Sequence, residues 1–204
     1  MIGIIDYGSG NINAIATIYK NLNIECVIVS NPNDLDSADK LILPGVGSFD
    51  ETMRHMLNSG LKSKLDELVL VRKTPILGIC VGMQILSNSS EEGSLNGLGW
   101  INGKVKKFEK EWFQTKPHIP HMGWNQITPR KSTPLFDNLD DELGFYFVHS
   151  YYFDCEDSDD TLAITDYGIT FSSAVSKANI YGVQFHPEKS HGNGVNLLKN
   201  FAIL

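Results

Sequence analysis

Cysteine is scarce in this chain, and the spacing of the few cysteines excludes two kinds of site. The 204 residues contain three cysteines, Cys26, Cys80 and Cys155, and no Cys-x-x-Cys pair. Widely spaced cysteines in an odd number argue against a disulfide framework and against a zinc site built from cysteine. We therefore predict a cytoplasmic protein with free thiols, and we predict no metal and no other cofactor.

A long apolar run and an excess of positive charge are missing as well. No apolar run approaches the length of a membrane span, and residues 1–6 lack the basic segment of a signal peptide, so none is expected. With 17 Lys and Arg against 24 Asp and Glu, the formal charge of −7 disfavours binding to nucleic acid or to an anionic membrane. The length, the 42% hydrophobic content and the lack of a linker predict one domain over residues 1–204.

Short apolar runs alternate with helical patterns in the first half of the chain. The predicted strands span residues 2–5, 24–29 and 40–43, with a fourth that carries Cys80, and the predicted helices span 11–21, 49–58 and 61–72. This alternation predicts right-handed βαβ units and a parallel sheet, at whose carboxyl edge Asp6, the Pro44–Gly47 loop and Cys80 can converge. The Gly8-Ser9-Gly10 loop lacks the third glycine of a dinucleotide site, so NAD binding is not expected.

The second half of the chain has the pattern of antiparallel strands. We predict a hairpin between Trp100-Ile101 and residues 104–108, whose lysines form a solvated edge, and one aromatic strand over residues 144–153. The remaining predictions are an acidic surface loop at 154–160, strands at 161–166, 171–176 and 180–185, and a last helix that follows 191–196. The predicted fold class is α/β: an open, mostly parallel sheet flanked by helices, of flavodoxin-like type, with additional antiparallel strands.

The stretch Gly78-Ile79-Cys80-Val81-Gly82-Met83-Gln84 stands where a strand passes into a helix. A cysteine with a glycine two residues away on either side is the thiol counterpart of the Gly-x-Ser-x-Gly nucleophile elbow. The sharp turn needs small neighbours, and the N–H groups that begin the helix favour a thiolate and can face a developing oxyanion. A buried, inert cysteine is the alternative interpretation, and this stretch alone gives the two equal weight.

His186 is the histidine best placed to serve such a cysteine. It ends an apolar strand, and in extended backbone Glu188, two positions on, can point to the same side. Pro187 fixes the backbone between them, so the carboxylate can select the tautomer of the imidazole. With Cys80, the pair predicts a Cys-His-Glu triad. The other five histidines lie in helical, loop or aromatic contexts and are interpreted as structural: His55, His118, His121, His149 and His191.

Three stretches together resemble the class I glutamine amidotransferases, the glutaminase domains with a triad. They are Pro44-Gly45-Val46-Gly47, Gly78 to Gln84, and His186-Pro187-Glu188-Lys189-Ser190, and they occur in the expected order over nearly the whole chain. Within that class, Met83 and the stretches 6–11, 97–99 and 120–125 resemble the glutaminase subunits of imidazole glycerol phosphate synthases. Val81 stands where the family most often has leucine. We expect little consequence, because the role implied for this position, donation to the oxyanion, belongs to the backbone N–H and not to the side chain.

The resemblance implies a role for each matching residue. Cys80 is the nucleophile, His186 the general base and acid, and Glu188 the carboxylate that orients the imidazole. The implied oxyanion donors are the N–H of Val81 and that of Val46 or Gly47, in a loop whose alternative interpretation is a tight turn. The implied glutamine-binding positions are Gly47, Gln84, Glu92, His149, Ser150 and Tyr151, with Glu91 leaving the register of Glu92 open. The chemistry is amide hydrolysis through a thioester, which releases ammonia and glutamate.

The resemblance also implies a partner, because the glutaminase uses the whole chain. In the family, a cyclase subunit with a phosphate-binding (β/α)₈ barrel forms a heterodimer with the glutaminase and receives the ammonia. The products are imidazole glycerol phosphate and an aminoimidazole carboxamide ribotide, which link histidine and purine synthesis. The residues implied at the interface are Asn11, Trp124 and Lys189; their structural alternatives are a helix cap, a core aromatic and a solvated lysine. Family members are typically poor glutaminases alone, which places regulation in the loop around Val46.

Three other functions remain open at this point. The same glutaminase chemistry could supply a sugar amidotransferase in surface-glycan synthesis, which the identity of the co-purifying chain would decide. A stand-alone cysteine hydrolase or peptidase predicts turnover of peptides or esters without a partner. A non-catalytic module of flavodoxin-like type predicts no labelling of Cys80 by a glutamine-analogue electrophile.

Overall fold

A mixed sheet runs through the molecule and carries the predicted functional edge. The computed structural model describes residues 1–113 and 119–204. The parallel half of the sheet has the order β2-β1-β3-β4-β13, with β1 (Ile2–Ile5), β2 (Cys26–Val29), β3 (Lys40–Gly45), β4 (Ile76–Cys80) and β13 (Ile180–Val183). The central strands β1 and β4 are buried along their whole length, as expected of parallel strands covered on both faces.

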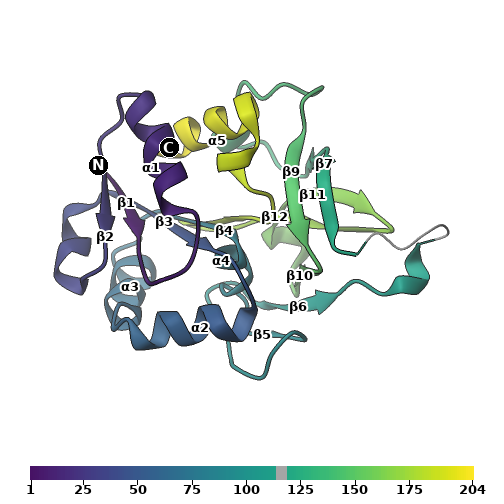
Figure 1. Cartoon of the computed structure of the whole chain (residues 1–204), viewed down its shortest axis with the longest axis horizontal. Coiled ribbons are helices and arrows are strands. Elements are labelled where there is room, and N and C mark those ends of the chain that lie inside the picture. Colours follow the sequence, from purple (N-terminus) through teal and green to yellow (C-terminus); the bar gives the residue numbers. More distant parts are fainter. Residues whose placement is uncertain (114–118) are drawn as a thin grey trace.

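Helices cover both faces of this parallel half. Figure 1 shows α1 (Ile12–Asn21) and α5 (His191–Ile203) on one face, and α2 (Phe49–Asn58) and α3 (Lys62–Asp66) on the other. The helix predicted over 61–72 is α3 followed by a π-helical turn at Glu67–Val71. The short α4 (Val81–Gln84) follows β4 directly. The predicted α/β architecture, with a mostly parallel sheet between helices, is therefore confirmed.

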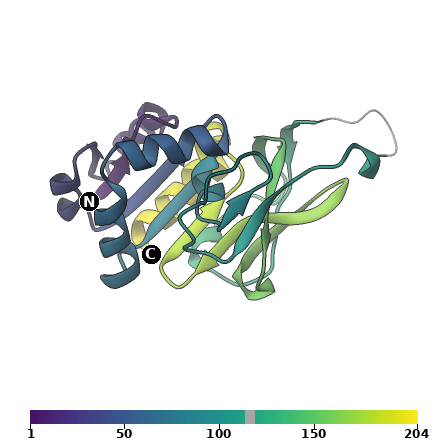
Figure 2. The ribbon, with the colours of Figure 1, turned by 90° about the horizontal axis from the view of Figure 1, so that it is seen from below.

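Antiparallel strands extend the sheet beyond β13, and Figure 2 shows them gathered at the end of the molecule away from the N-terminal helices. The order continues β12-β10-β6-β5, and β11 pairs with both β12 and β8. A separate two-stranded sheet is formed by β7 and β9. The bounds are β5 (Ser89–Ser90), β6 (Gly103–Lys107), β7 (His121–Asn125), β8 (Thr128–Pro129), β9 (Phe145–His149), β10 (Tyr151–Cys155), β11 (Thr161–Tyr167) and β12 (Ile169–Lys177).

The predicted hairpin between Trp100-Ile101 and residues 104–108 is wrong. The backbone N–H groups of Trp100 and Ile101 both donate to Leu86 O, at 2.9 and 3.1 Å, so this segment packs against the end of α4. The strand β6 pairs instead with β10, antiparallel, and with β5, parallel. Its lysines are half-exposed, as predicted, but the strand is flanked on both sides and is no edge.

The single aromatic strand predicted over 144–153 is two strands in two sheets. The chain bends at Ser150, so that β9 pairs with β7 and β10 enters the main sheet between β12 and β6. The acidic loop predicted at 154–160 is also wrong in part, because β10 continues to Cys155 and Asp160 is buried. The three strands predicted after it are present as β11, β12 and β13, with ends shifted by a few residues.

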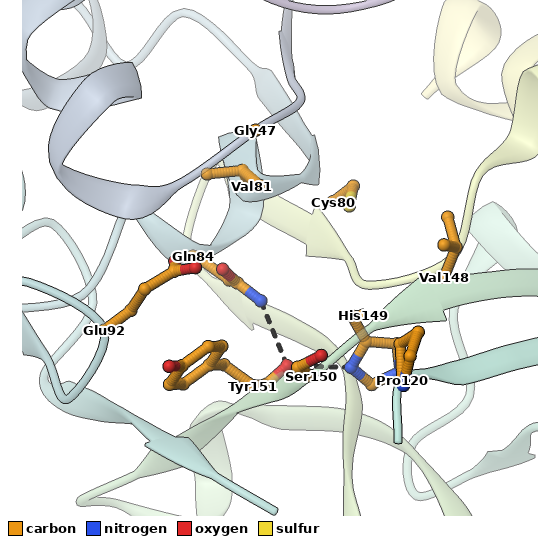
Figure 3. A pocket seen from close by; sticks show the side chains of 10 residues that line it. All are labelled: Gly47, Cys80, Val81, Gln84, Glu92, Pro120, Val148, His149, Ser150 and Tyr151. Carbon is orange, nitrogen blue, oxygen red and sulfur yellow. Dashed lines mark hydrogen bonds between the residues drawn. The ribbon is translucent and has the colours of Figure 1, made fainter. Parts of the chain in front are cut away.

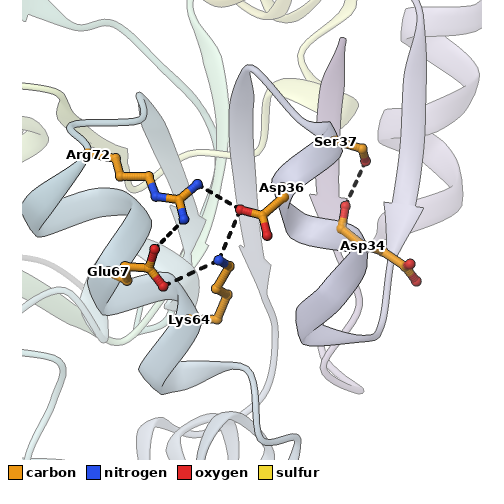
Figure 4. A network of polar contacts seen from close by, with 6 residues as sticks. All are labelled: Asp34, Asp36, Ser37, Lys64, Glu67 and Arg72. Carbon is orange, nitrogen blue, oxygen red and sulfur yellow. Dashed lines mark hydrogen bonds and ion pairs between the residues drawn. The ribbon is translucent and has the colours of Figure 1, made fainter.

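A network of charged side chains joins α3 to the 3₁₀ turn Pro32–Ser37 (Figure 4). Asp36 Oδ1 lies 2.9 Å from Lys64 Nζ and 2.8 Å from an Arg72 guanidinium nitrogen, and Glu67 contacts the same two cations. Because most of these side chains are about half-exposed, water and salt screen the network, and it adds little to stability.

Within residues 1–113 and 119–204, no helix combines the length and the apolar character that crossing a membrane requires. One prediction, the structural role of His118, falls outside the described residues.

Candidate active site

Cys80 occupies a strained turn between β4 and α4. Its φ of 55° and ψ of −113° place it in the left-handed region, which residues with a side chain rarely adopt. A Cβ added to Gly82 would lie 2.0 Å from Leu43 O, and one added to Gly78 would lie 2.7 Å from Gly82 O. The two glycines are therefore required by close backbone approach, which is the geometry that the sequence predicted for a nucleophile elbow.

His186 comes beside Cys80 because β13 pairs in parallel with β4. The register places Val183 next to Ile79, so the chain beyond β13 runs along the elbow. His186 Nδ1 lies 2.8 Å from Glu188 Oε1, and the side chains are 4% and 1% exposed. The predicted pairing of the two is present, with Nδ1 facing the carboxylate.

The electrostatics of His186 are set by its two neighbours. Burial alone lowers the pKa of an imidazole, but hydrogen bonds to Cys80 and Glu188, and the negative charges of both, outweigh it and raise the pKa of His186 well above 6.5. A protonated imidazole between a thiolate and a carboxylate can give a proton to a leaving group. The same imidazole, once neutral, can take a proton from water.

A cavity of about 250 Å³ opens in front of the thiol (Figure 3). It brings together Cys80, all six positions that the resemblance assigned to glutamine binding, and two of the three implied oxyanion residues, of which Gly47 counts in both sets: Gly47, Val81, Gln84, Glu92, His149, Ser150 and Tyr151. Pro120 and Val148 also line it, and the sequence had not singled them out. The cavity therefore combines a thiol in a strained turn, a carboxylate and several polar groups, and its volume suits an amino acid.

Of the neighbouring Glu91 and Glu92, only Glu92 lines the cavity, and each has a fixed partner. Glu92 Oε2 accepts a hydrogen bond from Phe49 N at 2.8 Å, at the start of α2, whereas Glu91 is exposed and bonds to Lys107 N and Lys104 Nζ. Of the two carboxylates, Glu92 is the one that lines the cavity. Burial raises the pKa of Glu92, against the hydrogen bond from Phe49, which lowers it.

The Pro44–Gly47 loop does not present Val46 to the cavity. Val46 N donates to Ser9 Oγ at 3.0 Å, and the same hydroxyl donates to Val46 O at 2.9 Å. Tyr7 Oη donates to Pro44 O at 2.6 Å, so the segment after β1 holds this loop at two points. Gly47, with φ of +95°, lines the cavity. In this conformation the N–H of Val46 is not available to an oxyanion.

The three residues assigned to a partner interface lie at or near the surface. Trp124 is 47% exposed and stacks on His191 with ring centroids 5.0 Å apart, so the core interpretation is wrong. The exposed Lys189 places Nζ 5.7 Å from the ring centroid of Tyr146. Asn11 begins α1, but its side chain makes no capping hydrogen bond.

His149, which lines the cavity, shares a hydrogen bond with the buried His121. His121 Nδ1 lies 3.0 Å from His149 Nε2, and His149 Nδ1 lies 2.7 Å from Tyr151 O. Burial lowers the pKa of His121 to about 4 and, together with the charge of His121, that of His149 to about 3. The structural role predicted for these two histidines is consistent with this satisfied, neutral pair, whereas His55 and His191 are exposed.

We expect the His121–His149 pair to lower the free energy of unfolding on acidification, at pH values above those at which carboxylates titrate. Both pKa values are lower in the fold than the 6.5 of an unfolded chain, so the unfolded state binds protons first as the pH falls. The contribution of this pair is therefore full above about pH 6.5 and falls below it by up to ~2.7 kcal/mol per pH unit for two protons. His186 acts in the opposite sense near pH 6.5, because its raised pKa keeps it protonated in the fold while the unfolded chain still takes up the proton, and it adds little once both states are protonated. Urea unfolding between about pH 6 and pH 5 therefore measures the slope of the pair.

The matched variants for this prediction are His121→Asn, which removes one titrating group, and His55→Gln, which removes an exposed one. The slope should be roughly halved in the first and unchanged in the second. A free energy of unfolding that is flat over this interval in the unaltered chain would contradict the prediction.

Sequence reasoning missed the residues that hold the site together from a distance. They are Ser9, His121 in its contact with His149, and Gln184, whose Nε2 lies 3.8 Å from Cys80 Sγ. The only signal available was a polar residue inside an apolar run, as in Tyr181-Gly182-Val183-Gln184-Phe185. Within the described part of the chain, no group of three or more His, Cys, Asp or Glu side chains is arranged to hold a metal ion.

The chain is similar over its whole length to proteins of one family. Residues 3–204 match the family "Glutamine amidotransferase class-I". The "Imidazole glycerol phosphate synthase subunit HisH" of Leptospira borgpetersenii is 52% identical over 204 residues, covering 100% of both chains. That of Bdellovibrio bacteriovorus is 50% identical over 202 residues, covering 99% of each.

Solved structures agree on the fold. The structure of PurLQS from Thermotoga maritima superposes with a TM-score of 0.75 at 16% identity, covering 99% of this chain and 96% of that one. A crystal structure described as a glutamine amidotransferase gives a TM-score of 0.71 at 18% identity, covering 100% of this chain and 99% of that one. At these identities the likeness concerns the fold alone. The full-length relatives carry the assignment: the chain belongs to the class I glutamine amidotransferases and, within them, to the HisH subunits of imidazole glycerol phosphate synthase.

Proposed function

We propose that this chain hydrolyses glutamine at Cys80 and passes the ammonia to a cyclase subunit with a phosphate-binding (β/α)₈ barrel. The two chains form a heterodimer that makes imidazole glycerol phosphate and an aminoimidazole carboxamide ribotide for histidine synthesis. The observation that carries the proposal is the cavity in front of Cys80, whose size and lining fit glutamine. Relatives at 50–52% identity named as subunits of this synthase support the acceptor.

The reaction runs in two halves. The Cys80 thiolate attacks the side-chain carbonyl of glutamine, the carbonyl π electrons move to oxygen, and the C–N bond breaks as His186 gives its proton to the departing ammonia. Water then adds to the thioester, with His186 taking its proton and Glu188 stabilising the imidazolium. The electron pair of the C–S bond returns to sulfur, and glutamate leaves. Glu92 pairs with the α-ammonium of the substrate by charge.

The oxyanion needs two donors, and one of them is not in place. Val81 begins α4 and lines the cavity with Cys80, whereas Val46 N donates to Ser9 Oγ. Rotation of the Val46–Gly47 peptide would break the hydrogen bond that Ser9 Oγ donates to Val46 O and turn the Gly47 N–H toward the cavity. We place regulation at this peptide: partner binding supplies the second donor, so the isolated subunit is a poor glutaminase.

The interface lies on the side of the molecule where Trp124 and Lys189 are exposed, with Asn11 contributing from the start of α1. Trp124 and Lys189 both contact the ring of Tyr146, and an exposed tryptophan is typical of an interface residue rather than of solvent-facing surface. The proposal treats residues 1–204 as one glutaminase domain and places it in the cytoplasm, where its three free thiols stay reduced.

Glutamate production by the chain alone, with the cyclase of the same organism, and with cyclase plus its nucleotide ligand tests the proposal. We expect the last condition to exceed the first by at least about tenfold, equivalent to ~1.4 kcal/mol of transition-state stabilisation. Trp124→Ala and Lys189→Glu should weaken the complex, while Lys199→Glu, an exposed residue of α5, serves as the control.

Two outcomes would contradict the proposal. If the cyclase neither binds nor stimulates the chain but a sugar amidotransferase does, the ammonia has another acceptor. If peptides or esters are hydrolysed without a partner and glutamine is not, the chain is a hydrolase of a different substrate class.

A further inference from the structure

A buried amide touches the sulfur of Cys80. Gln184 follows β13, two residues before His186, and its side chain is 0% exposed. Its Nε2 lies 3.8 Å from Cys80 Sγ, within hydrogen-bond distance for sulfur. Burying an amide is unfavourable unless its donors and acceptors are paired, so its two ends need specific partners.

The neighbours of Gln184 decide which end faces the sulfur. Tyr151 O can only accept, so the Gln84 atom 3.1 Å away is its NH₂ group. The same NH₂ lies 3.0 Å from the Gln184 side chain, which must present its oxygen there. The NH₂ of Gln184 is then left at the other end of the amide, against Cys80 Sγ. A backbone carbonyl thus fixes the orientation of two amides in series.

Tyr151 O also accepts a hydrogen bond from His149, and a series of side-chain hydrogen bonds connects His149 to two residues of the strand β7. His149 Nδ1 donates to Tyr151 O, which leaves His149 Nε2 to accept from His121 Nδ1. His121 Nε2 then accepts from Asn125 Nδ2 at 3.3 Å, and the Asn125 amide also donates to Asp166 O. Because both imidazoles are neutral, each has one donor and one acceptor nitrogen, and every hydrogen bond in the series has only one possible donor.

We infer that Gln184 is a catalytic hydrogen-bond donor to the Cys80 thiolate, and that Gln84 is a positioning residue that aims the Gln184 amide at the sulfur. The inference rests on Cys80 being the nucleophile of the proposed glutaminase. An N–H donor stabilises the charged sulfur more than the neutral thiol, so it favours the thiolate before attack. When the thioester hydrolyses, the C–S electron pair returns to sulfur, and the same donor stabilises the departing thiolate.

Alkylation of Cys80 by iodoacetamide in the full-length chain tests the inference without glutamine or a partner. The rate is followed by mass spectrometry of the Cys80 peptide from about pH 5 to pH 9, which separates it from Cys26 and Cys155. Gln184→Leu should move the midpoint of the pH profile upward by about one unit, which slows alkylation by about tenfold at pH values well below the midpoint, as loss of one charge-assisted hydrogen bond predicts. Gln84→Met should give a smaller change in the same direction.

Gln184→Glu distinguishes the donor from a packing role. It keeps the shape and the oxygen that accepts from Gln84, but it places a carboxylate oxygen against the sulfur, so the midpoint should move further than in Gln184→Leu. Gln126→Leu removes an exposed amide and should change nothing. The Glu variant also decides the question if the Leu variant does not fold. A wild-type pH profile in a folded Gln184 variant overturns the inference, whereas shifted profiles without glutamine hydrolysis support it and count only against the proposed function.

Discussion

Replacing Cys80 with alanine is expected to reduce glutamine hydrolysis by about 10⁴- to 10⁶-fold, in the presence of saturating partner and ligand. The variant keeps the cavity and its polar lining but has no atom that can form a thioester, so only the direct attack of water remains. Glutamate release measures the loss. Labelling by a glutamine-analogue electrophile, read by mass spectrometry, should place the adduct on Cys80 in the unaltered chain and nowhere in the variant.

The matched control is Cys155→Ala. Cys155 is a half-buried thiol at the end of β10, outside the cavity, and burial raises its pKa, which makes it a poor nucleophile. Its removal should leave the hydrolysis rate and the labelling unchanged. Labelling that persists in Cys80→Ala but disappears in Cys155→Ala would move the nucleophile to the second thiol and refute the assignment.

The elbow and the His-Glu pair could be predicted because short-range backbone rules specify them. A left-handed residue in a close-packed turn requires Gly78 and Gly82 as neighbours, and Pro187 holds Glu188 within reach of His186. Their meeting in space followed from parallel pairing, which brings the carboxyl ends of β4 and β13 to one edge. Both the identity of the predicted triad residues and their meeting at one edge of the sheet could therefore be inferred from the sequence.

The errors fall where tertiary contacts decide the local structure. The aromatic pattern is similar on both sides of Ser150, so periodicity could not reveal that β9 and β10 belong to different sheets. Trp100 and Ile101 have the composition of a strand, yet their N–H groups are bound by Leu86 O. In both cases a partner distant in the fold outweighed a correct local preference.

The contacts that adjust the site could not be predicted, because they join side chains far apart in sequence. Ser9 meets Val46 across 37 positions, and Gln184 meets Cys80 across 104. Neither serine nor glutamine carries a local pattern that announces such a contact. Sequence thus points to the groups proposed to react, whereas the structure adds the side chains that contact the Pro44–Gly47 loop and the sulfur of Cys80.

Replacing Glu188 with glutamine is expected to reduce glutamine hydrolysis by about 10²- to 10⁴-fold in the complex with the partner. Glu188 Oε1 binds His186 Nδ1, while Oε2 is buried and has no hydrogen-bond partner in the described part of the chain. A glutamine can therefore keep its oxygen on Nδ1 and place its NH₂ where Oε2 stood. The tautomer survives in that orientation, but the negative charge that stabilises the imidazolium is lost.

The pH profile separates this electrostatic effect from a packing defect. Glu188 is one of the two groups that raise the pKa of His186, so its neutral replacement lowers that pKa toward the ordinary value. Protonated His186, which ammonia release needs, then disappears at lower pH, and the alkaline limb of the rate profile should move down by about one unit or more. Glu156→Gln, at an exposed site, should leave rate and profile unchanged. A reduced rate with an unmoved alkaline limb would mean that Glu188 acts by packing, and a wild-type rate would remove it from the triad.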